Sequence, residues 1–242
     1  VYICTDATAG ANVWTNTGGT SGNVEPYFFG GTQYGFCYGG TYPTSADIQK
    51  WSFTSDGNAT DVGDQSVERR NHGGASSATY GYNFGGWPSD VIDKFPFASG
   101  GTATDVGNLL SQLRYVSSAT TEDYGWCAGG AGPIINVIQR FAFASDGNAT
   151  DWADLNTPRS GASTGMCSAT HGYTSGGYTT AYSNEIEKYP FASQTNATDI
   201  GNLVLVRQGA AGVSSCEHGY IVGGVTVGTN PGNSAPLWQR SN

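Results

Sequence analysis

The chain has 242 residues, of which 37 are glycine and 12% are aromatic, and its formal net charge is −9. High glycine and aromatic content with few long charged side chains favours short strands joined by tight turns over helices. The negative charge argues against a nucleic-acid partner and favours a protein outside the cell, and no apolar run approaches the roughly 18 residues that a membrane helix needs.

A segment of the sequence recurs four times, starting at Asp47, Asp90, Asn136 and Asn184. Each copy carries Ile, a basic residue two places later, an aromatic residue next and Phe two places after that. A turn and an Asp-hydrophobe pair follow. The Ile residues are 44, 46 and 48 positions apart, and so are the Asp residues. A repeat this regular predicts a repeat architecture.

A second element precedes each copy and ends in Gly-Gly. It occupies residues 34–40, 80–86, 124–130, 171–177 and 218–224, which makes five units. A stretch of small residues lies upstream of it, as in GGASSAT (73–79). Each unit therefore offers four short extended segments: a small-residue strand, an aromatic strand, the Ile-basic-aromatic strand and an Asp-hydrophobe strand.

These units predict an all-β fold, a five-bladed β-propeller of four-stranded antiparallel blades in one domain over residues 1–242. We expect repeats at about 27–72, 73–116, 117–163, 164–210 and 211–242, after a lead-in and closing strand at 1–26. The last repeat lacks a fourth strand and residues 11–18 are spare, so we expect the N- and C-terminal strands to share one blade and close the ring. A rival register places residues 1–4 on the third strand, and residues 109–116 favour a turn of helix.

The order of Arg, small residues, an aromatic strand closing on Gly-Gly and a hydrophobic-basic-aromatic strand resembles the kelch repeat. The resemblance runs from about Tyr27 to the C-terminus, although only Trp152 stands where kelch fourth strands carry Trp. More narrowly, VIDKFPFAS (91–99) with TATDVGNL (102–109) resembles kelch-like proteins of marine bacteriophages, where such wording occurs in virion or tail-associated proteins. The opening YICTDATAGANVWTNTG (2–18) resembles a segment that precedes such repeats in phage structural proteins.

This resemblance implies a non-catalytic structural or adhesive protein of a phage particle, located on the virion or outside the cell. The implied partners are a host cell-surface glycan or other virion proteins, without nucleic acid and without a membrane span. Two alternatives stay open: a carbohydrate-binding or adhesive module of a bacterial surface protein, and a propeller enzyme that acts on glycans.

The sequence contains no strong catalytic or metal-binding motif. SDGNATDW (145–152) has the wrong spacing for a sialidase Asp box, and the same turn in other copies loses the Asp that a cation site would need. The Asn-Ala-Thr within this segment matches the sequon for N-glycosylation, but the same residues are also typical of a tight turn. Two of the three His residues replace Tyr at one repeat position, and the five Cys form no disulfide framework. We therefore expect no catalytic residue, no metal and no cofactor.

The loops between the second and third strands vary between repeats, and binding residues usually lie on such loops. They carry flat aromatic side chains suited to sugars or to a protein surface: Tyr42, Trp87, Tyr178 and Tyr182. We expect them to share a face with arginines that precede the small-residue strands: Arg70, Arg114, Arg159 and Arg207. The structural alternatives are local aromatic packing and arginines that bond carbonyls of the neighbouring blade; the functional one is a ring of cations that meets an acidic ligand.

Overall fold

A computed structural model describes residues 2–6, 13–16, 33–41, 43–162, 165–214, 218–226 and 239–241. The chain divides into two compact units, Val1–Thr32 and Gln33–Asn242. In the first unit, β1 (Tyr2–Asp6) and β2 (Val13–Asn16) form a two-stranded antiparallel sheet.

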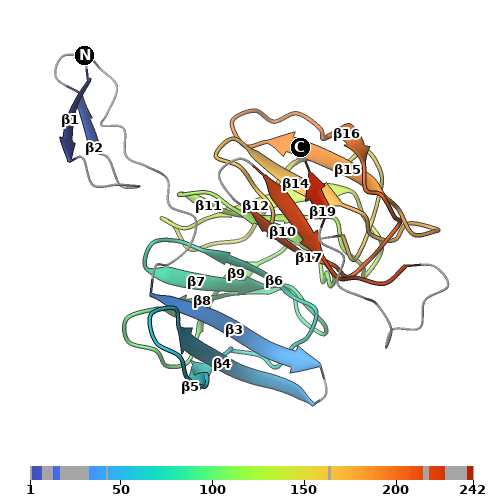
Figure 1. Ribbon diagram of the computed structural model, residues 1–242. Coiled ribbons are helices and arrows are strands. Elements are labelled where there is room, and N and C mark those ends of the chain that lie inside the picture. Colours follow the sequence, from blue (N-terminus) through green and yellow to red (C-terminus); the bar gives the residue numbers. More distant parts are fainter. Residues whose placement is uncertain are drawn as a thin grey trace. The chain divides into compact units, whose positions relative to one another are not determined.

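The described residues of the second unit form five antiparallel sheets, which we number in chain order (Figure 1). The first contains β3 (Tyr34–Thr41), β4 (Thr44–Ser52) and β5 (Thr60–Asp64). The second contains β6 (Gly73–Ser76), β7 (Tyr80–Phe84), β8 (Val91–Pro96) and β9 (Thr104–Asn108). The third contains β10 (Ser117–Thr120), β11 (Tyr124–Ala128), β12 (Val137–Ala142) and β13 (Thr150–Asp154). The fourth contains β14 (His171–Ser175), β15 (Glu185–Pro190) and β16 (Thr198–Asn202), and the fifth contains β17 (Ala211–Ser214), β18 (Gly219–Val222) and β19 (Gln239–Ser241).

The all-β class and the strand order within a repeat are as the sequence predicts. The four predicted strands are all present in the second and third sheets, whereas the other three sheets of the second unit have three strands each in the described chain. In the fourth sheet a single bridge between Cys167 and Gly172 stands in for the first strand. The turn of helix expected at residues 109–116 is absent, since this stretch runs as bends into β10.

The pairing expected for ring closure differs from the observed one. We expected residues 11–18 to complete the last sheet, but β2 pairs with β1. The two strands are separated by only six residues, so their pairing closes a short loop, whereas pairing with the C-terminal sheet would close a loop of more than 200 residues.

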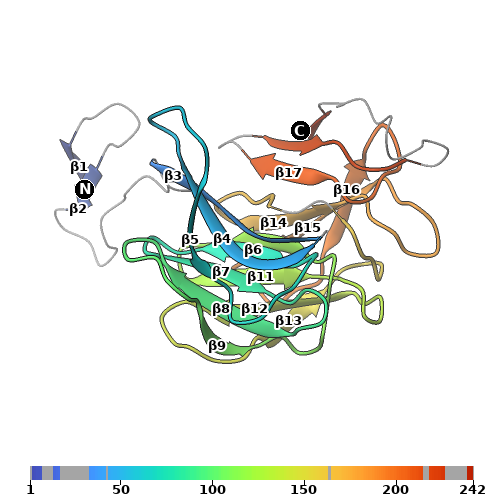
Figure 2. The same ribbon diagram turned by 90° about the horizontal axis from the view of Figure 1, so that it is seen from below.

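The first four sheets of the second unit pack face to face through one repeated set of aromatic residues (Figure 2). The second strand of the repeat contributes a ring that packs on a ring at the end of the third strand of the next sheet. Phe36–Phe97 and Tyr82–Phe143 are stacked, with ring centroids 4.8 Å and 4.5 Å apart, and Trp126–Phe191 is tilted at 4.8 Å. Such pairs add about 0.5–1.5 kcal/mol each beyond the apolar area that they bury. The fourth and fifth sheets pack through smaller apolar residues that include Ile186 and Ile221.

The constant turn between the third and fourth strands also joins neighbouring sheets. Asn148 accepts a hydrogen bond from the backbone N–H of Asn108 (3.0 Å), and the N–H of Ala149 donates to the carbonyl of Asn108 (2.8 Å). Asn196 and Ala197 bind Asp154 in the same way. The Asn-Ala sequence therefore links these two turns to the fourth strand of the preceding sheet, and in the second sheet Ala103 makes the same backbone bond to Asp64 (2.7 Å) after a Thr in place of the Asn.

The Gly-Gly pairs lie where each sheet meets the segment that leads to the next. Gly176 has φ of 65°, and a Cβ there would lie 2.5 Å from the carbonyl oxygen of Arg207. The N–H of Gly177 donates to the same oxygen at 2.7 Å. Any side chain at the first glycine would break this approach, which explains why Gly-Gly is the least variable part of the repeat.

Candidate functional site

The segments that join the last strand of one sheet to the first strand of the next are here called linkers. Each linker bridges the residue that follows Gly-Gly in the sheet it leads to. The bridged pairs are Arg70–Trp87, Arg114–Ala131, Ser160–Tyr178 and Gln208–Val225. The linkers therefore lie beside the starts of the variable loops, and we call the surface that they share the linker face.

The bridges show that the four arginines of the sequence pattern occupy two different positions. Arg70 and Arg114 are bridged, and we call their place the outer linker position; Ser160 and Gln208 fill it in the other linkers. The residue after it has positive φ in all four linkers: Asn71 (59°), Tyr115 (55°), Gly161 (62°) and Gly209 (63°). Arg159 and Arg207 lie one residue earlier, at the buried linker position, together with Arg69 and Leu113.

The buried linker position serves the structure. Arg159 is only 1% exposed; its guanidinium donates to the carbonyl of Gly176 (3.0 Å) and forms ion pairs with Glu185 (2.5 Å) and Glu187. Arg207 is also buried and donates to the carbonyl of Gly223 at 2.7 Å. The structural alternative thus describes these two residues, and neither guanidinium is exposed to a partner.

Arg69 is a structural arginine that the sequence pattern missed. It is fully buried, pairs with Asp93 and donates to the carbonyls of Val91 (2.6 Å) and Gly85 (3.2 Å). A signal for it exists within the repeats. Arg69 faces Asp93 and Arg159 faces Glu187, whereas Leu113 belongs to the repeat that carries the neutral Gln139 at the acid position. Charge is thus matched at these three contacts, whereas Arg207 faces the sheet that carries the neutral Gln239 at the acid position and donates to the Gly223 carbonyl.

Burial shifts the pKa of several groups around these ion pairs. Desolvation raises the pKa of Glu187, and Arg159 opposes that shift. Desolvation and the nearby charge of Arg69 lower the pKa of His72 to about 4, so the ring is neutral at pH 7 and its Nε2 lies 3.1 Å from the carbonyl oxygen of Tyr38. Burial also raises the pKa of the Cys127 thiol, which makes it unreactive.

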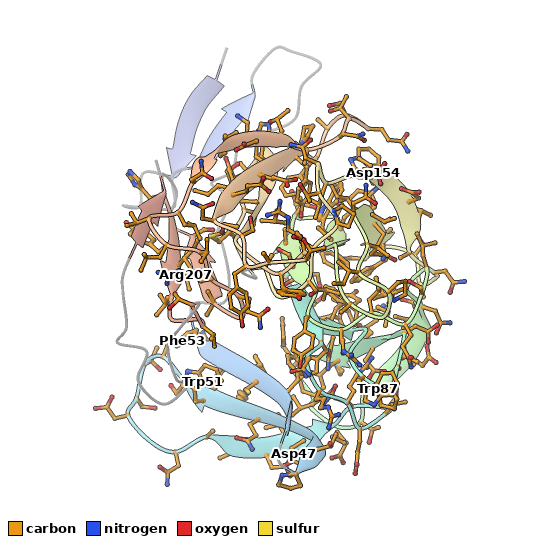
Figure 3. The ribbon with its side chains drawn as sticks, turned by 90° about the vertical axis from the view of Figure 1, so that its right-hand side faces the viewer. Asp47, Trp51, Phe53, Trp87, Asp154 and Arg207 are labelled. Atoms are coloured by element: carbon orange, nitrogen blue, oxygen red, sulfur yellow. The ribbon has the colours of Figure 1, made fainter. Side chains whose placement is uncertain are left out.

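The outer linker position carries an exposed cluster. The guanidinium carbon of Arg114 lies 5.2 Å from the centroid of the Trp87 ring and 5.9 Å from that of Tyr115. Trp87 is 42% exposed and Tyr115 is 47% exposed, and Figure 3 shows Trp87 at the surface of the second unit. Across the described chain, the Arg114 guanidinium has no hydrogen bond and no ion pair. We call Trp87, Arg114 and Tyr115 the Trp-Arg-Tyr cluster.

Hydrogen bonds from linker to linker hold this cluster in place. Tyr115 donates its N–H to the carbonyl of Asn71 (2.8 Å) and accepts from Gly161 (2.8 Å), and Gly161 in turn accepts from Gly209 (2.7 Å). The left-handed conformation that these bonds require costs a residue with Cβ roughly 1–2 kcal/mol. Sequence reasoning missed Tyr115; the signal was that two other repeats carry Gly at its place.

The other predicted aromatic residues fall on the same face or outside the described residues. Tyr178 is partly exposed, and its ring packs edge-on against Tyr182 with centroids 5.8 Å apart. Local packing thus occupies one side of each ring. Tyr42 lies outside the described residues, and the Arg70 side chain is half-buried.

The basic residues of the third strands are already occupied elsewhere. Arg140 lies 3.6 Å from the Trp152 ring centroid and 4.2 Å from that of Tyr124, and Lys94 pairs with Asp146 at 2.9 Å. Lys50 lies 3.7 Å from the Tyr34 ring centroid. These cations are half-buried against rings of their own sheets.

Two kinds of structure are absent from the described residues. No group of three His, Cys, Asp or Glu side chains in these ranges is arranged to hold a metal ion. In the same part of the chain, no helix has the length and apolarity needed to cross a membrane.

Comparisons with known proteins show the fold. No protein-family model and no curated protein matches the chain. The solved structure of YjhT matches 79% of this chain and 71% of its own length with a TM-score of 0.64 at 12% sequence identity. Together with the successive face-to-face sheets, this similarity shows that the chain has a propeller-like all-β fold.

The buried ion pair can be tested with the neutral pair that the chain itself provides. Arg159→Leu alone leaves Glu187 buried without its cation, and we expect a loss of about 3–5 kcal/mol in the free energy of unfolding. The double variant Arg159→Leu with Glu187→Gln reproduces the Leu113 and Gln139 combination and should recover most of that loss. Urea unfolding followed by circular dichroism measures both. Additive losses in the double variant would contradict the pairing.

Proposed function

We propose that the chain is a non-catalytic binding component of a bacteriophage particle whose linker face attaches to a glycan on the host surface. The observation that carries this proposal is the Trp-Arg-Tyr cluster, which presents two exposed rings and an unpaired guanidinium on one surface. Flat aromatic rings stack on the apolar faces of sugars, and a guanidinium offers directed hydrogen bonds.

Two further observations support an attachment role. The loops of this face differ between repeats while the turns on the other side are constant, so the linker face is the part of the repeat that the architecture leaves free to vary. The sequence wording resembles virion-associated proteins of marine phages. A neighbouring virion protein, or the partner of a bacterial adhesin, would be bound through the same surface.

We further infer that the five sheets are kelch-like blades of one closed ring. The first sheet leaves Trp51 (37% exposed) and Phe53 (56% exposed) uncovered, where later sheets bury the equivalent aromatic residues (Figure 3). The fifth sheet leaves Val213 exposed beside Tyr220, its partner across β17 and β18. These are the two complementary halves of the ring contact that joins the first sheet to the second, the second to the third and the third to the fourth, so their packing would close the ring.

Hydroxyl-radical footprinting of the intact chain tests this closure. We expect Trp51 and Phe53 to react about as slowly as the buried Phe95, and far more slowly than the exposed Trp87, because closure removes them from water. Reaction of Trp51 at the rate of Trp87 in a monomeric sample would contradict closure. Protection that disappears on dilution would assign the contact to a second copy and also contradict a ring closed within one chain.

The binding face is tested on an array of bacterial surface polysaccharides. We expect the triple variant Trp87→Ala, Tyr178→Ala and Tyr182→Ala to weaken binding by more than tenfold, because buried aromatic contacts carry on the order of 1–2 kcal/mol each. The control variant Asp56→Asn with Asp146→Asn changes two exposed side chains in the constant turns and should bind like the parent. Retained binding in the first variant and loss in the second would show that the wrong face has been chosen.

A further inference from the structure

We propose that the Trp-Arg-Tyr cluster is a site for a carboxylated sugar, with Arg114 holding the carboxylate and the Trp87 ring supporting the sugar. This inference rests on the proposed glycan-binding role of the linker face and names the class of sugar that the face takes. It depends on three features: the stacked guanidinium, the strained backbone of Tyr115 and the charge of the chain.

The guanidinium of Arg114 is placed to bind a planar anion. Arg114 is half-buried, and its guanidinium carbon lies over the Trp87 ring at 5.2 Å and the Tyr115 ring at 5.9 Å from their centroids, contacts that use no N–H group. Its N–H groups lie in the plane of the group, and no described residue accepts from them. A carboxylate can accept two parallel hydrogen bonds from the N–H groups of one guanidinium. Because the contacts with Trp87 and Tyr115 already restrict the Arg114 side chain, binding costs less conformational entropy.

Tyr115 carries a side chain at a position whose left-handed backbone conformation favours glycine. Its φ of 55° is imposed by the hydrogen bonds to Asn71 and from Gly161, and the equivalent Gly161 and Gly209 adopt the same conformation without a Cβ. The Tyr115 ring is nearly half exposed, so its packing returns little stability. A strained residue that persists without a structural gain marks a functional position.

The overall charge selects a single carboxylate over a polyanion. The chain carries a net charge of −9, and the linker face offers only Arg70 and Arg114 as unpaired cations among the described residues. A nucleic acid or a heavily sulfated polymer would meet repulsion along its length, because charges interact over a Debye length of about 8 Å in physiological salt. One carboxylate on an otherwise neutral glycan is held by contact with one guanidinium.

A second pair of rings lies near enough to extend the site. The carbonyl of Tyr115 accepts from Gly161, and the preceding Ser160 bridges Tyr178, whose ring packs on Tyr182. The Trp-Arg-Tyr cluster and this tyrosine pair are therefore one linker apart. A short oligosaccharide with its acidic residue on Arg114 would place neutral sugars toward the tyrosines.

The probes are methyl β-D-glucuronide and methyl β-D-glucoside, which differ by the carboxylate. Titrations of the full chain followed by NMR measure both dissociation constants. We expect the glucuronide to bind at least fivefold more tightly and Arg114→Gln to abolish this difference. The matched control Arg140→Gln removes the same charge from another stacked guanidinium, between Tyr124 and Trp152, and should retain the difference. Equal binding of the two sugars by the parent, or an equal effect of both variants, overturns the inference.

Tyr115→Gly separates binding from folding. Because glycine relieves the left-handed strain, we expect the variant to unfold at the same or higher urea concentration than the parent and to bind the glucuronide at least threefold more weakly. A loss of stability with unchanged binding would show that Tyr115 is retained for packing, and would overturn its assignment to the site.

Failure of this inference and failure of the proposed function give different results. If the aromatic triple variant loses polysaccharide binding but the parent does not prefer the glucuronide, the linker face binds glycans and the carboxylate assignment is wrong. If the aromatic triple variant binds polysaccharides as the parent does, the proposed function fails. A preference for acidic peptides over the glucuronide would also overturn the assignment to a sugar.

Discussion

The structure depends on the buried linker position, where Arg159 and Arg207 each bond to the sheets on both sides of their linker. The carbonyl of Arg159 accepts from Gly130 in the sheet behind it (2.8 Å), and its guanidinium donates to the carbonyl of Gly176 in the sheet ahead (3.0 Å). The Gly-Gly pairs permit this because their backbones approach the linker more closely than a Cβ allows. Sheets of three or four short strands have little core of their own, so their stability comes from such contacts between neighbours.

The same linkers carry the candidate site. In three linkers the carbonyl of the residue at the buried position accepts a hydrogen bond from the second glycine of the preceding Gly-Gly pair; these residues are Leu113, Arg159 and Arg207. Arg114 follows Leu113 at the outer linker position, and the hydrogen bonds from Asn71 through Tyr115 to Gly209 fix the backbone on which it lies. A binding site built on segments that also hold the sheets together is rigid, and rigidity lowers the entropic cost of binding.

Much of the fold could be predicted from the sequence, because the repeat spacing, the alternation of apolar residues and the Gly-Gly pairs are local signals. The pairing of β2 with β1 could not, because strand partners distant in sequence leave no local mark. The site was predicted in part. Trp87 and Arg114 lie close together, as expected from their loops. The sequence pattern, however, treated Arg114 and Arg159 as equivalent, although they lie one residue apart in the repeat. A shift of one residue moves a side chain from the surface to the interior. Tyr115 escaped notice because strain shows only in the backbone angle.

Amide hydrogen exchange of the intact chain tests most directly whether the linkers hold the sheets together and keep the linker face rigid. The account predicts that the amides of Gly130, Gly177, Tyr115 and Gly161 exchange only when the whole second unit unfolds, at the rate of amides in the middle of β7 and β11. Exchange of these amides through local openings, many times faster than that of the strand amides, would contradict it. The linkers would then be mobile connections, and neither their structural role nor the preformed site would stand.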